Sequence, residues 1–400
     1  MFHAKIERFI SICDILIVCQ IVVIQSKFNL KSVDFLKTFQ DPLTRKLCKL
    51  RTNELIEYNG YRAEEHNVIT EDGYNLTIFR CNSKNRSPDK DKVVVLHHGL
   101  LASSDDYCMN VPSQSLAYIL ADAGYDVFLS NSRGNSYSRS HITLTPNDKR
   151  FWNFSWYVIA IYDYPAVFDY VIKETKQTKV NVVAFSMGTT SMMTLLSDRP
   201  EYNDYVRAAS LMAPVGYIKY AGAFYQTLES FHKFLVRFSN TELLPKGILT
   251  ELFATFCGAS FQPLCEKLSY IIFGPSQGQV NHTMMANFFC HLPSGTSLNQ
   301  ILHYGSEIRH NYFGEYMRGS TVPPDFNLSQ IRAPISLHYS PNDILGDPKD
   351  VAKLIPKLNN CLARVQFVNQ TKFNHYDFIW GIQAAELVYS NIMSFFNEHQ

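Results

Sequence analysis

Residues 182–189 read Val182-Val183-Ala184-Phe185-Ser186-Met187-Gly188-Thr189, an apolar run that stops at a serine and passes through small residues into a helix-forming stretch. This pattern predicts a nucleophile elbow, in which a tight turn between a buried strand and a helix holds the serine hydroxyl clear of its neighbours. A serine placed in this way can attack a carbonyl carbon. Elbows usually read Gly-x-Ser-x-Gly, and Ala184 replaces the first glycine here, so the rest of the sequence must support the interpretation.

Two further residues follow Ser186 in an order that narrows the fold. Asp343 lies four residues after an apolar run at 334–339 that predicts a buried strand, and His375 lies on the loop after a second run at 365–368. The order serine, aspartate, histidine differs from that of chymotrypsin-like and subtilisin-like proteases and indicates an α/β-hydrolase. Because parallel strands end at one edge of their sheet, we expect the three residues to meet there as a catalytic triad.

A candidate oxyanion hole lies upstream of the elbow. Residues 93–101 read as a strand that runs into a glycine-containing loop, His98-Gly99-Leu100-Leu101. We expect the backbone amides of Leu100 and Met187 to donate to the oxyanion of a tetrahedral intermediate. Each such donor contributes roughly 10²- to 10³-fold in rate.

Strand and helix patterns alternate over 93–214, which predicts a mostly parallel central sheet covered by helices. The alternation stops near residue 216 and resumes near 334. We therefore interpret 216–326 as an inserted, mainly helical cap or lid. The hydrolase core is then formed by 27–215, which contains the elbow, and 327–400, which contains the aspartate and the histidine.

Large apolar residues in the insertion recur at helical spacing and predict a helix with an apolar face. They are Phe224, Leu228, Phe231, Leu235 and Phe238. One interpretation is ordinary packing of the cap on its core, because such stripes are usually buried. The other is a lid that shields a long acyl chain and exposes an apolar patch when it opens at a lipid surface.

Several long strings, in the right order, resemble the acid lipase family, the group that contains gastric lipase, lysosomal acid lipase and insect relatives. The resemblance covers most of the chain. The strings lie at 53–61, 70–74, 98–104, 131–135, 151–156, 162–166, 347–350 and 373–380.

The resemblance implies that Ser186, Asp343 and His375 form the triad and that Leu100 and Met187 form the oxyanion hole. It also implies a disulfide between Cys257 and Cys265. The implied substrate is a triacylglycerol or a steryl ester at a lipid–water interface, hydrolysed at acid pH. The chain departs from the family pattern at three positions, Ala184, Phe185 and Val158, and none of them belongs to the triad.

The N-terminus has the pattern of a secretory signal peptide. Lys5 and Arg8 precede a mostly apolar stretch from Phe9 to Ile24, and we place the cleavage near Ser26, so that the signal spans 1–26. The alternatives are an uncleaved signal anchor and an incorrectly assigned start. The mature chain would contain no stable membrane span, and its odd number of cysteines implies at least one free thiol in a secreted protein.

Six sequons also favour the secretory pathway, with secretion or delivery to lysosomes as the outcome. The candidate glycosylation sites are Asn75, Asn85, Asn153, Asn281, Asn327 and Asn369. Asn153 lies between aromatic residues, which favours its burial. Asn281 and Asn327 are therefore the stronger candidates.

Composition excludes some classes of function. The formal net charge is +1 and only 18% of the residues are charged, so there is no basic stripe for nucleic acid. Without clustered histidines we expect no metal site, and the chemistry needs no cofactor. His97 and His98 at a strand end, and the turn at Asp72-Gly73, are explained by structure alone. We expect Arg133 and Asp163 to tie loops together through ion pairs.

The sequence therefore predicts an ester hydrolase that works through an acyl-enzyme. Two other functions stay open. One is a soluble carboxylesterase whose cap shapes a pocket for short esters. The other is a lipid-binding protein of lipase descent in which the altered elbow has lost turnover.

Overall fold

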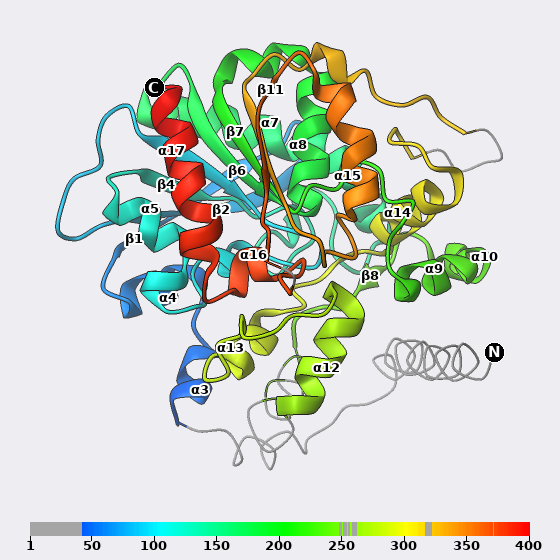
Figure 1. Ribbon diagram of the computed structural model, residues 1–400, viewed down its shortest axis with the longest axis horizontal. Coiled ribbons are helices and arrows are strands. Elements are labelled where there is room, and N and C mark those ends of the chain that lie inside the picture. Colours follow the sequence, from blue (N-terminus) through cyan, green and yellow to red (C-terminus); the bar gives the residue numbers. More distant parts are fainter. Residues whose placement is uncertain are drawn as a thin grey trace.

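The computed structural model describes residues 42–247, 250, 254, 257, 262–316, 322–370 and 372–400. The predicted signal peptide at 1–26 lies outside the described residues. Figure 1 shows a central sheet with helices on both sides, and helices of the inserted segment at one end of the molecule.

The sheet is mostly parallel, as the sequence predicts, in the order β1-β2-β4-β3-β6-β7-β10-β11, with β5 paired to β2. All pairs from β4 to β11 are parallel, whereas β1-β2, β2-β4 and β2-β5 are antiparallel. The strands are β1 (Arg62–Ile69), β2 (Tyr74–Asn82), β3 (Val93–His97), β4 (Asp126–Leu129), β5 (Ser140–His141), β6 (Val180–Phe185), β7 (Val206–Met212), β10 (Ile335–Tyr339) and β11 (Leu362–Phe367).

The central strands are mostly apolar and almost entirely buried, because both of their faces are covered. In β3, Val93 and Val95 contribute to one hydrophobic cluster, and Val94 and Leu96 contribute to the other. Helices α7 (Tyr164–Thr175), α8 (Met187–Asp198) and α15 (Pro348–Leu354) contribute to the first cluster. Helices α4 (Thr52–Tyr58), α5 (Leu116–Asp122), α16 (Asp377–Trp380) and α17 (Ser390–Glu398) contribute to the second.

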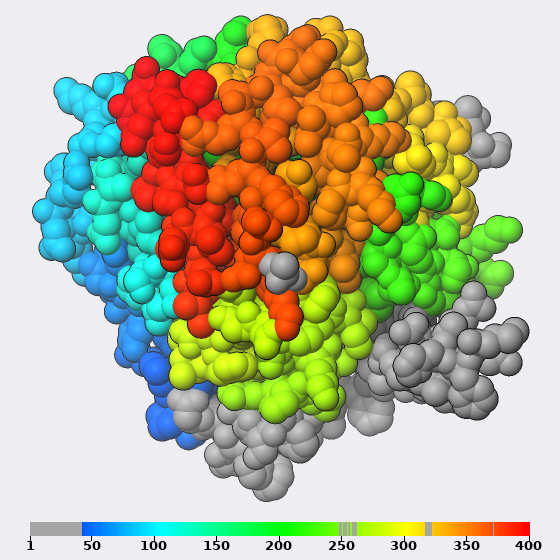
Figure 2. Space-filling model, viewed as in Figure 1, coloured from blue at the N-terminus to red at the C-terminus, as the bar shows by residue number. Residues whose placement is uncertain are grey.

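Between β7 and β10 the chain forms short helices and two short strands that pair antiparallel with each other, although helices lie between them in the sequence. These elements are α9 (Ala223–Ser230), α10 (His232–Leu235), β8 (Glu242–Leu243), α12 (Gln262–Phe273), α13 (Met285–His291), β9 (Thr296–Ser297) and α14 (Leu298–His310). Figure 2 shows the surface of α12 and α13 against the C-terminal part of the core. We keep the name cap for 216–326, whose boundaries stay a prediction.

The apolar-faced helix expected over 224–238 is not continuous. Helix α9 ends at Ser230, where Phe231 leaves helical geometry (φ −89°, ψ 5°), and α10 is followed by a 3₁₀ turn at Val236–Phe238. Three large side chains of this segment, Phe231, Phe234 and Phe238, are exposed. Within the described residues, no helix combines the length and the apolar character that a membrane crossing requires.

Candidate active site

The serine sits where the sequence places it, between β6 and α8. Its backbone has φ 53° and ψ −120°, a strained conformation for a residue with a side chain. The Ser186 amide donates to the Met212 carbonyl at the end of β7 (3.1 Å), which fixes the turn at the edge of the sheet. The local geometry is therefore that of a nucleophile elbow.

The structure brings together Ser186, Asp343 and His375, although 189 residues separate the first from the last. The Nε2 atom of His375 lies 2.7 Å from Ser186 Oγ, and its Nδ1 atom lies 2.9 Å from both carboxylate oxygens of Asp343. All three side chains are buried, with Ser186 only 8% exposed. The chain of contacts serine–imidazole–carboxylate can move a proton from the hydroxyl to the ring.

Backbone amides hold the carboxylate of Asp343 in place. The amides of Leu345 and Gly346 each donate to Oδ1 at 2.8 Å. These two bonds orient the carboxylate toward Nδ1 of His375.

The histidine loop is held by the cap and by its own neighbours. The amide of His375 donates to the Phe273 carbonyl (3.1 Å), and Asn374 Nδ2 donates to the Gly274 carbonyl (2.8 Å) at the end of α12. Asn374 Oδ1 accepts from the Asp377 amide (3.0 Å), and Asp377 Oδ2 accepts from the Asn374 amide (2.7 Å). This reciprocal pair is of the capping-box type, and the spacing Asn-x-x-Asp could have predicted it.

The loop after β3 lies directly against the elbow. A methyl group added at Gly99 would lie 3.2 Å from Ser186 Cβ, and one added at Gly188 would lie 2.6 Å from the His97 carbonyl. Gly188 is therefore needed for this close approach, and Gly99 leaves little room for a side chain. Leu100 follows Gly99 in the loop, and Met187 follows Ser186 in the elbow. The role of their amides as oxyanion donors stays a proposal.

His98 has a positioning role that the sequence did not predict. Its Nδ1 atom lies 2.8 Å from the Gly99 carbonyl, and its Nε2 atom accepts from the Ser132 amide (3.0 Å), so the ring is neutral with its proton on Nδ1. Burial lowers the pKa of His98 to about 4. The Gly99 carbonyl belongs to the same peptide group as the Leu100 amide, so His98 orients that amide.

The departures from the family pattern fit the structure. Ala184 is buried in β6 between His97 of β3 and Leu211 of β7, and its methyl group is part of the core. Phe185 packs on the triad, with its ring centroid 5.1 Å from that of His375. Val158 is half-buried and packs against the same core cluster.

Arg133 forms the loop-tying ion pairs that the sequence predicts. It is 1% exposed, and its Nε atom lies 2.6 Å from Asp163 Oδ1. Its terminal nitrogens contact both carboxylate oxygens of Asp72 at 2.5 and 2.8 Å, and its guanidinium lies 4.0 Å from the centre of the Tyr74 ring. The turn at Asp72 and the loop after β4 are thereby joined.

Cys257 and Cys265 form a disulfide, and a second disulfide links Cys48 to Cys290. The sequence analysis missed the second pair, because 242 residues separate its members and spacing gives no signal over that length. The free thiols are buried in the described part of the chain. They belong to Cys81, Cys108 and Cys361.

The sequons differ in accessibility. Asn85, Asn153, Asn327 and Asn369 are exposed, whereas Asn75, in strand β2, and Asn281 are half-buried. The expectation for Asn153 was wrong, because the aromatic residues Trp152 and Phe154 point inward and leave the asparagine outside. Glycosylation of the six candidate asparagines stays a prediction.

Among the described residues, no group of three or more His, Cys, Asp or Glu side chains is placed to hold a metal ion.

Comparison with known families and proteins agrees with this geometry. A model of the α/β-hydrolase fold matches residues 92–381, and a model of a partial α/β-hydrolase lipase region matches 52–111. The gastric triacylglycerol lipase of Rattus norvegicus is 34% identical over 88% of this chain and 92% of its own. Lipase 1 of Drosophila melanogaster is 35% identical over 89% of this chain and 83% of its own.

Solved structures share the fold at low identity. A soluble variant of monoglyceride lipase from Saccharomyces cerevisiae has a TM-score of 0.55 at 13% identity, covering 88% of this chain and 97% of its own. An esterase from Exiguobacterium antarcticum has a TM-score of 0.51 at 13% identity, covering 84% of this chain and 100% of its own. These likenesses confirm the predicted fold class.

Proposed function

This chain belongs to the acid lipase family of α/β-hydrolases and is an ester hydrolase, and from that premise we propose that it hydrolyses long-chain carboxylic esters through an acyl-enzyme on Ser186. The observation that carries the proposal is the continuous contact from Ser186 Oγ through the His375 ring to Asp343, at 2.7 and 2.9 Å. The strained elbow supports the same role for the serine.

The proposed reaction has two steps. In the first, Ser186 Oγ attacks the ester carbonyl while His375 Nε2 takes the hydroxyl proton, and Asp343 holds the imidazole in its productive tautomer. The C–O bond then breaks, and His375 gives the proton to the leaving alcohol. In the second, His375 activates a water molecule that attacks the acyl-enzyme and releases the fatty acid. The amides of Leu100 and Met187 stabilise the oxyanion in both steps.

The cap supports a preference for long acyl chains at a lipid–water interface. Because Ser186 is only 8% exposed, we propose that the cap moves to admit a long-chain substrate. The exposed Phe231, Phe234 and Phe238 on the surface of the cap offer apolar area to a lipid phase. A triacylglycerol or a steryl ester is the substrate class that we propose.

We place the enzyme in the secretory pathway, either secreted or in lysosomes, and we propose that it works at acid pH. The two disulfides support an oxidising compartment, and the exposed sequons provide sites for glycans. Three buried carboxyls support acid tolerance, because burial raises the pKa of Asp377 to about 7 and holds the pKa values of Asp106 and Glu307 well above their usual range. These groups are neutral in the fold at acid pH.

The test compares the mature protein with Ser186→Ala on emulsified long-chain triacylglycerol, on cholesteryl ester and on a short soluble ester, each at acid and neutral pH. We expect long-chain hydrolysis at acid pH that the substitution reduces by at least about 10³-fold. Activity on the short ester alone would favour a soluble carboxylesterase. A folded protein that is silent on every substrate and that a serine-reactive phosphonate does not label would be a lipid binder.

A further inference from the structure

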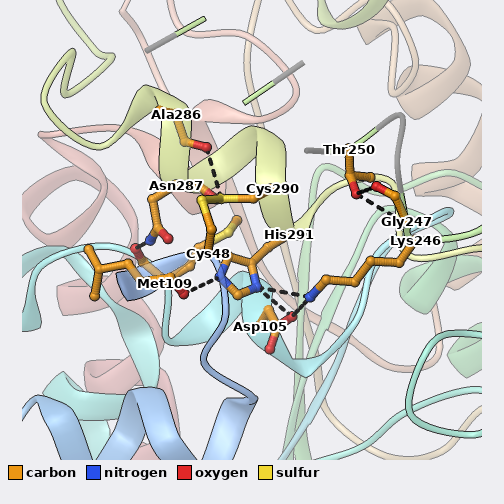
Figure 3. The surroundings of a disulfide bond; sticks show 11 residues. Cys48, Asp105, Met109, Lys246, Gly247, Thr250, Ala286, Asn287, Cys290 and His291 are labelled. Atoms are coloured by element: carbon orange, nitrogen blue, oxygen red, sulfur yellow. Dashed lines mark hydrogen bonds and ion pairs between the residues drawn. A yellow bond between two sulfur atoms is a disulfide. The ribbon is translucent and has the colours of Figure 1, made fainter. Parts of the chain in front are cut away.

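A buried carboxylate next to the oxyanion loop is the meeting point of four segments. Asp105 lies five residues after Leu100 and is 1% exposed. Its Oδ1 atom accepts from Thr52 Oγ1 (2.6 Å) and from the Tyr137 hydroxyl (2.8 Å). Its Oδ2 atom lies 2.8 Å from His291 Nδ1 and 3.4 Å from Lys246 Nζ, as Figure 3 shows. Every partner is a donor, as a buried carboxylate requires.

This carboxylate stays charged in the fold. Burial by itself would raise its pKa, but Lys246, His291 and the hydroxyl of Thr52 together hold the pKa of Asp105 well below its usual range. A buried charge of this kind is costly to leave without its partners. The partners are therefore tightly coupled to the position of Asp105.

Two of the partners, Lys246 and His291, belong to the cap. His291 is itself fixed, because its Nε2 atom lies 3.2 Å from the Leu47 carbonyl and its neighbour Cys290 is bonded to Cys48. Figure 3 shows the ring between this disulfide and Asp105. The cap is thus anchored at the point where it contacts the carboxylate.

The same part of the cap also contacts the loop at a second point. The Ser294 amide donates to the Leu101 carbonyl at 2.6 Å, directly beside Leu100. Leu101 has a positive φ of 61°, which a leucine adopts only when its surroundings impose it. At the other end of the loop, Ser103 Oγ accepts from the Asp105 amide at 3.3 Å. The cap therefore contacts this loop at Leu101 through Ser294 and at Asp105 through His291, and the bond between Ser103 and Asp105 stiffens the loop itself.

We propose that Asp105 and His291 are positioning residues for the oxyanion hole, through which the cap sets the place of the Leu100 amide. This inference rests on the proposed function. The cap then contributes to the acyl chemistry itself, in addition to covering the site. Loss of the pair should lower kcat even on a short ester that does not need the cap for binding.

The test uses p-nitrophenyl butyrate and a serine-reactive phosphonate with the full chain. The variants are Asp105→Asn, His291→Gln and the double variant, in which the introduced glutamine carbonyl can accept from the introduced asparagine amide. The matched control is Glu242→Gln, because Glu242 forms a second cap–core ion pair with Arg139 (2.7 Å) that does not touch the loop. Far-ultraviolet circular dichroism and Tm establish that each variant is folded.

We expect Asp105→Asn and His291→Gln to lower kcat by roughly 10- to 100-fold with KM changed less than about three-fold, and to slow phosphonate labelling in parallel. The double variant should regain part of the loss, and Glu242→Gln should stay within about two-fold of the wild type. Equal losses in Glu242→Gln, a loss confined to KM, or full activity in both single variants would overturn the inference while leaving the proposed function standing. A wild-type protein that neither reacts with the phosphonate nor hydrolyses the ester would contradict both this inference and the proposed function.

Discussion

The loop after β3 and the loop that carries His375 flank Ser186 on two sides and both contact the cap, yet different chemistry holds them. On the first, which we call the oxyanion flank, the buried carboxylate of Asp105 contacts His291 of the cap. On the second, the acid–base flank, main-chain carbonyls at the end of α12 accept from the His375 amide and from the Asn374 side chain. The comparison teaches that a buried charge ties the first flank to the cap, whereas neutral hydrogen bonds to main-chain carbonyls tie the second.

The largest expected effect concerns the disulfides, because only one of them anchors the oxyanion flank. Replacing Cys48 and Cys290 by serine opens a loop between residues 242 apart, and replacing Cys257 and Cys265 opens a loop between residues 8 apart. Loop entropy predicts losses of roughly 5 and roughly 2.5 kcal/mol in the free energy of unfolding. Urea unfolding of the two double variants measures the difference, and equal losses would contradict the proposed anchoring.

Two glycines test the flanks one at a time. A methyl group at Gly188 would lie 2.6 Å from the His97 carbonyl on the oxyanion flank, and one at Gly274 would lie 2.1 Å from the Asn342 carbonyl on the acid–base flank. Either contact must displace main chain, so we expect Gly188→Ala and Gly274→Ala each to lower kcat about 10²-fold. Gly278 is the control, because its φ is also positive (+70°) but nothing lies within 4 Å of an added methyl group.

The control separates steric displacement from backbone strain. Gly278→Ala should keep kcat within about two-fold and lose only about 1 kcal/mol of stability. If Gly274→Ala behaved in the same way, the acid–base flank would not depend on the path of the main chain at that point.

The flanks should also differ in their response to pH. Burial lowers the pKa of His98 to about 4 from 6.5, so its contribution to stability is full above pH 6.5 and is lost as pH falls toward 4. Burial raises the pKa of Asp377 to about 7 from 3.8, so its contribution is full below pH 3.8 and is lost as pH rises toward 7. Between pH 4 and 6.5 the two slopes have opposite sign and about the same size, about 1.4 kcal/mol per pH unit.

Removing one of the two groups should therefore reveal the pH dependence that the other gives to the free energy of unfolding. In Asp377→Asn the free energy of unfolding should rise with pH between 4.5 and 6.5 more steeply than in the wild type, by up to about 1.4 kcal/mol per unit. In His98→Gln it should fall with pH over the same range. Denaturant titrations at several pH values measure both slopes, and unchanged slopes would show that neither group titrates as proposed.

The smallest effect is expected for the capping asparagine on the acid–base flank. Asn374→Ala removes two accepted hydrogen bonds and one donated bond, and should cost about 1 kcal/mol and lower kcat roughly five-fold. Asn203 is a comparable control, since it also accepts from two backbone amides and donates to the Leu196 and Pro200 carbonyls (2.8 Å each). It lies just before the first residue of β7, at the end of the strand opposite to the elbow. Asn203→Ala should lose similar stability without a change in kcat.

The sequence predicted the strands of the sheet and the nucleophile elbow well, because short stretches of sequence encode them. The apolar runs gave the strands, and β6 at Val180–Phe185 ends directly before the serine. The order of Ser186, Asp343 and His375 indicated the fold, because each residue follows a strand and parallel strands end at one edge. Conversely, the predicted helix over 224–238 is interrupted at Phe231, where no glycine or proline in the sequence marks a break.

The contacts between segments far apart in the chain could not be predicted. Cys48 and Cys290 have no spacing that identifies them as a pair, and His98 gave no sign that it would hold the Gly99 carbonyl. Nothing in the sequence distinguishes Asp105 from other loop carboxylates, and only the fold surrounds it with donors. In each case the partner is chosen by tertiary packing, which no local pattern records.

The sequence by itself determined the fold family, the elbow and the identity of the three triad residues. The reason is that the apolar runs of the strands, and the order of the triad residues along the chain, can be read directly from the sequence. Only the tertiary structure decided how the cap contacts the two flanks, and which of the candidate glycosylation sites are exposed. The physical reason is burial: a side chain such as Asp105 acquires its charge state and its partners from the segments that exclude water around it.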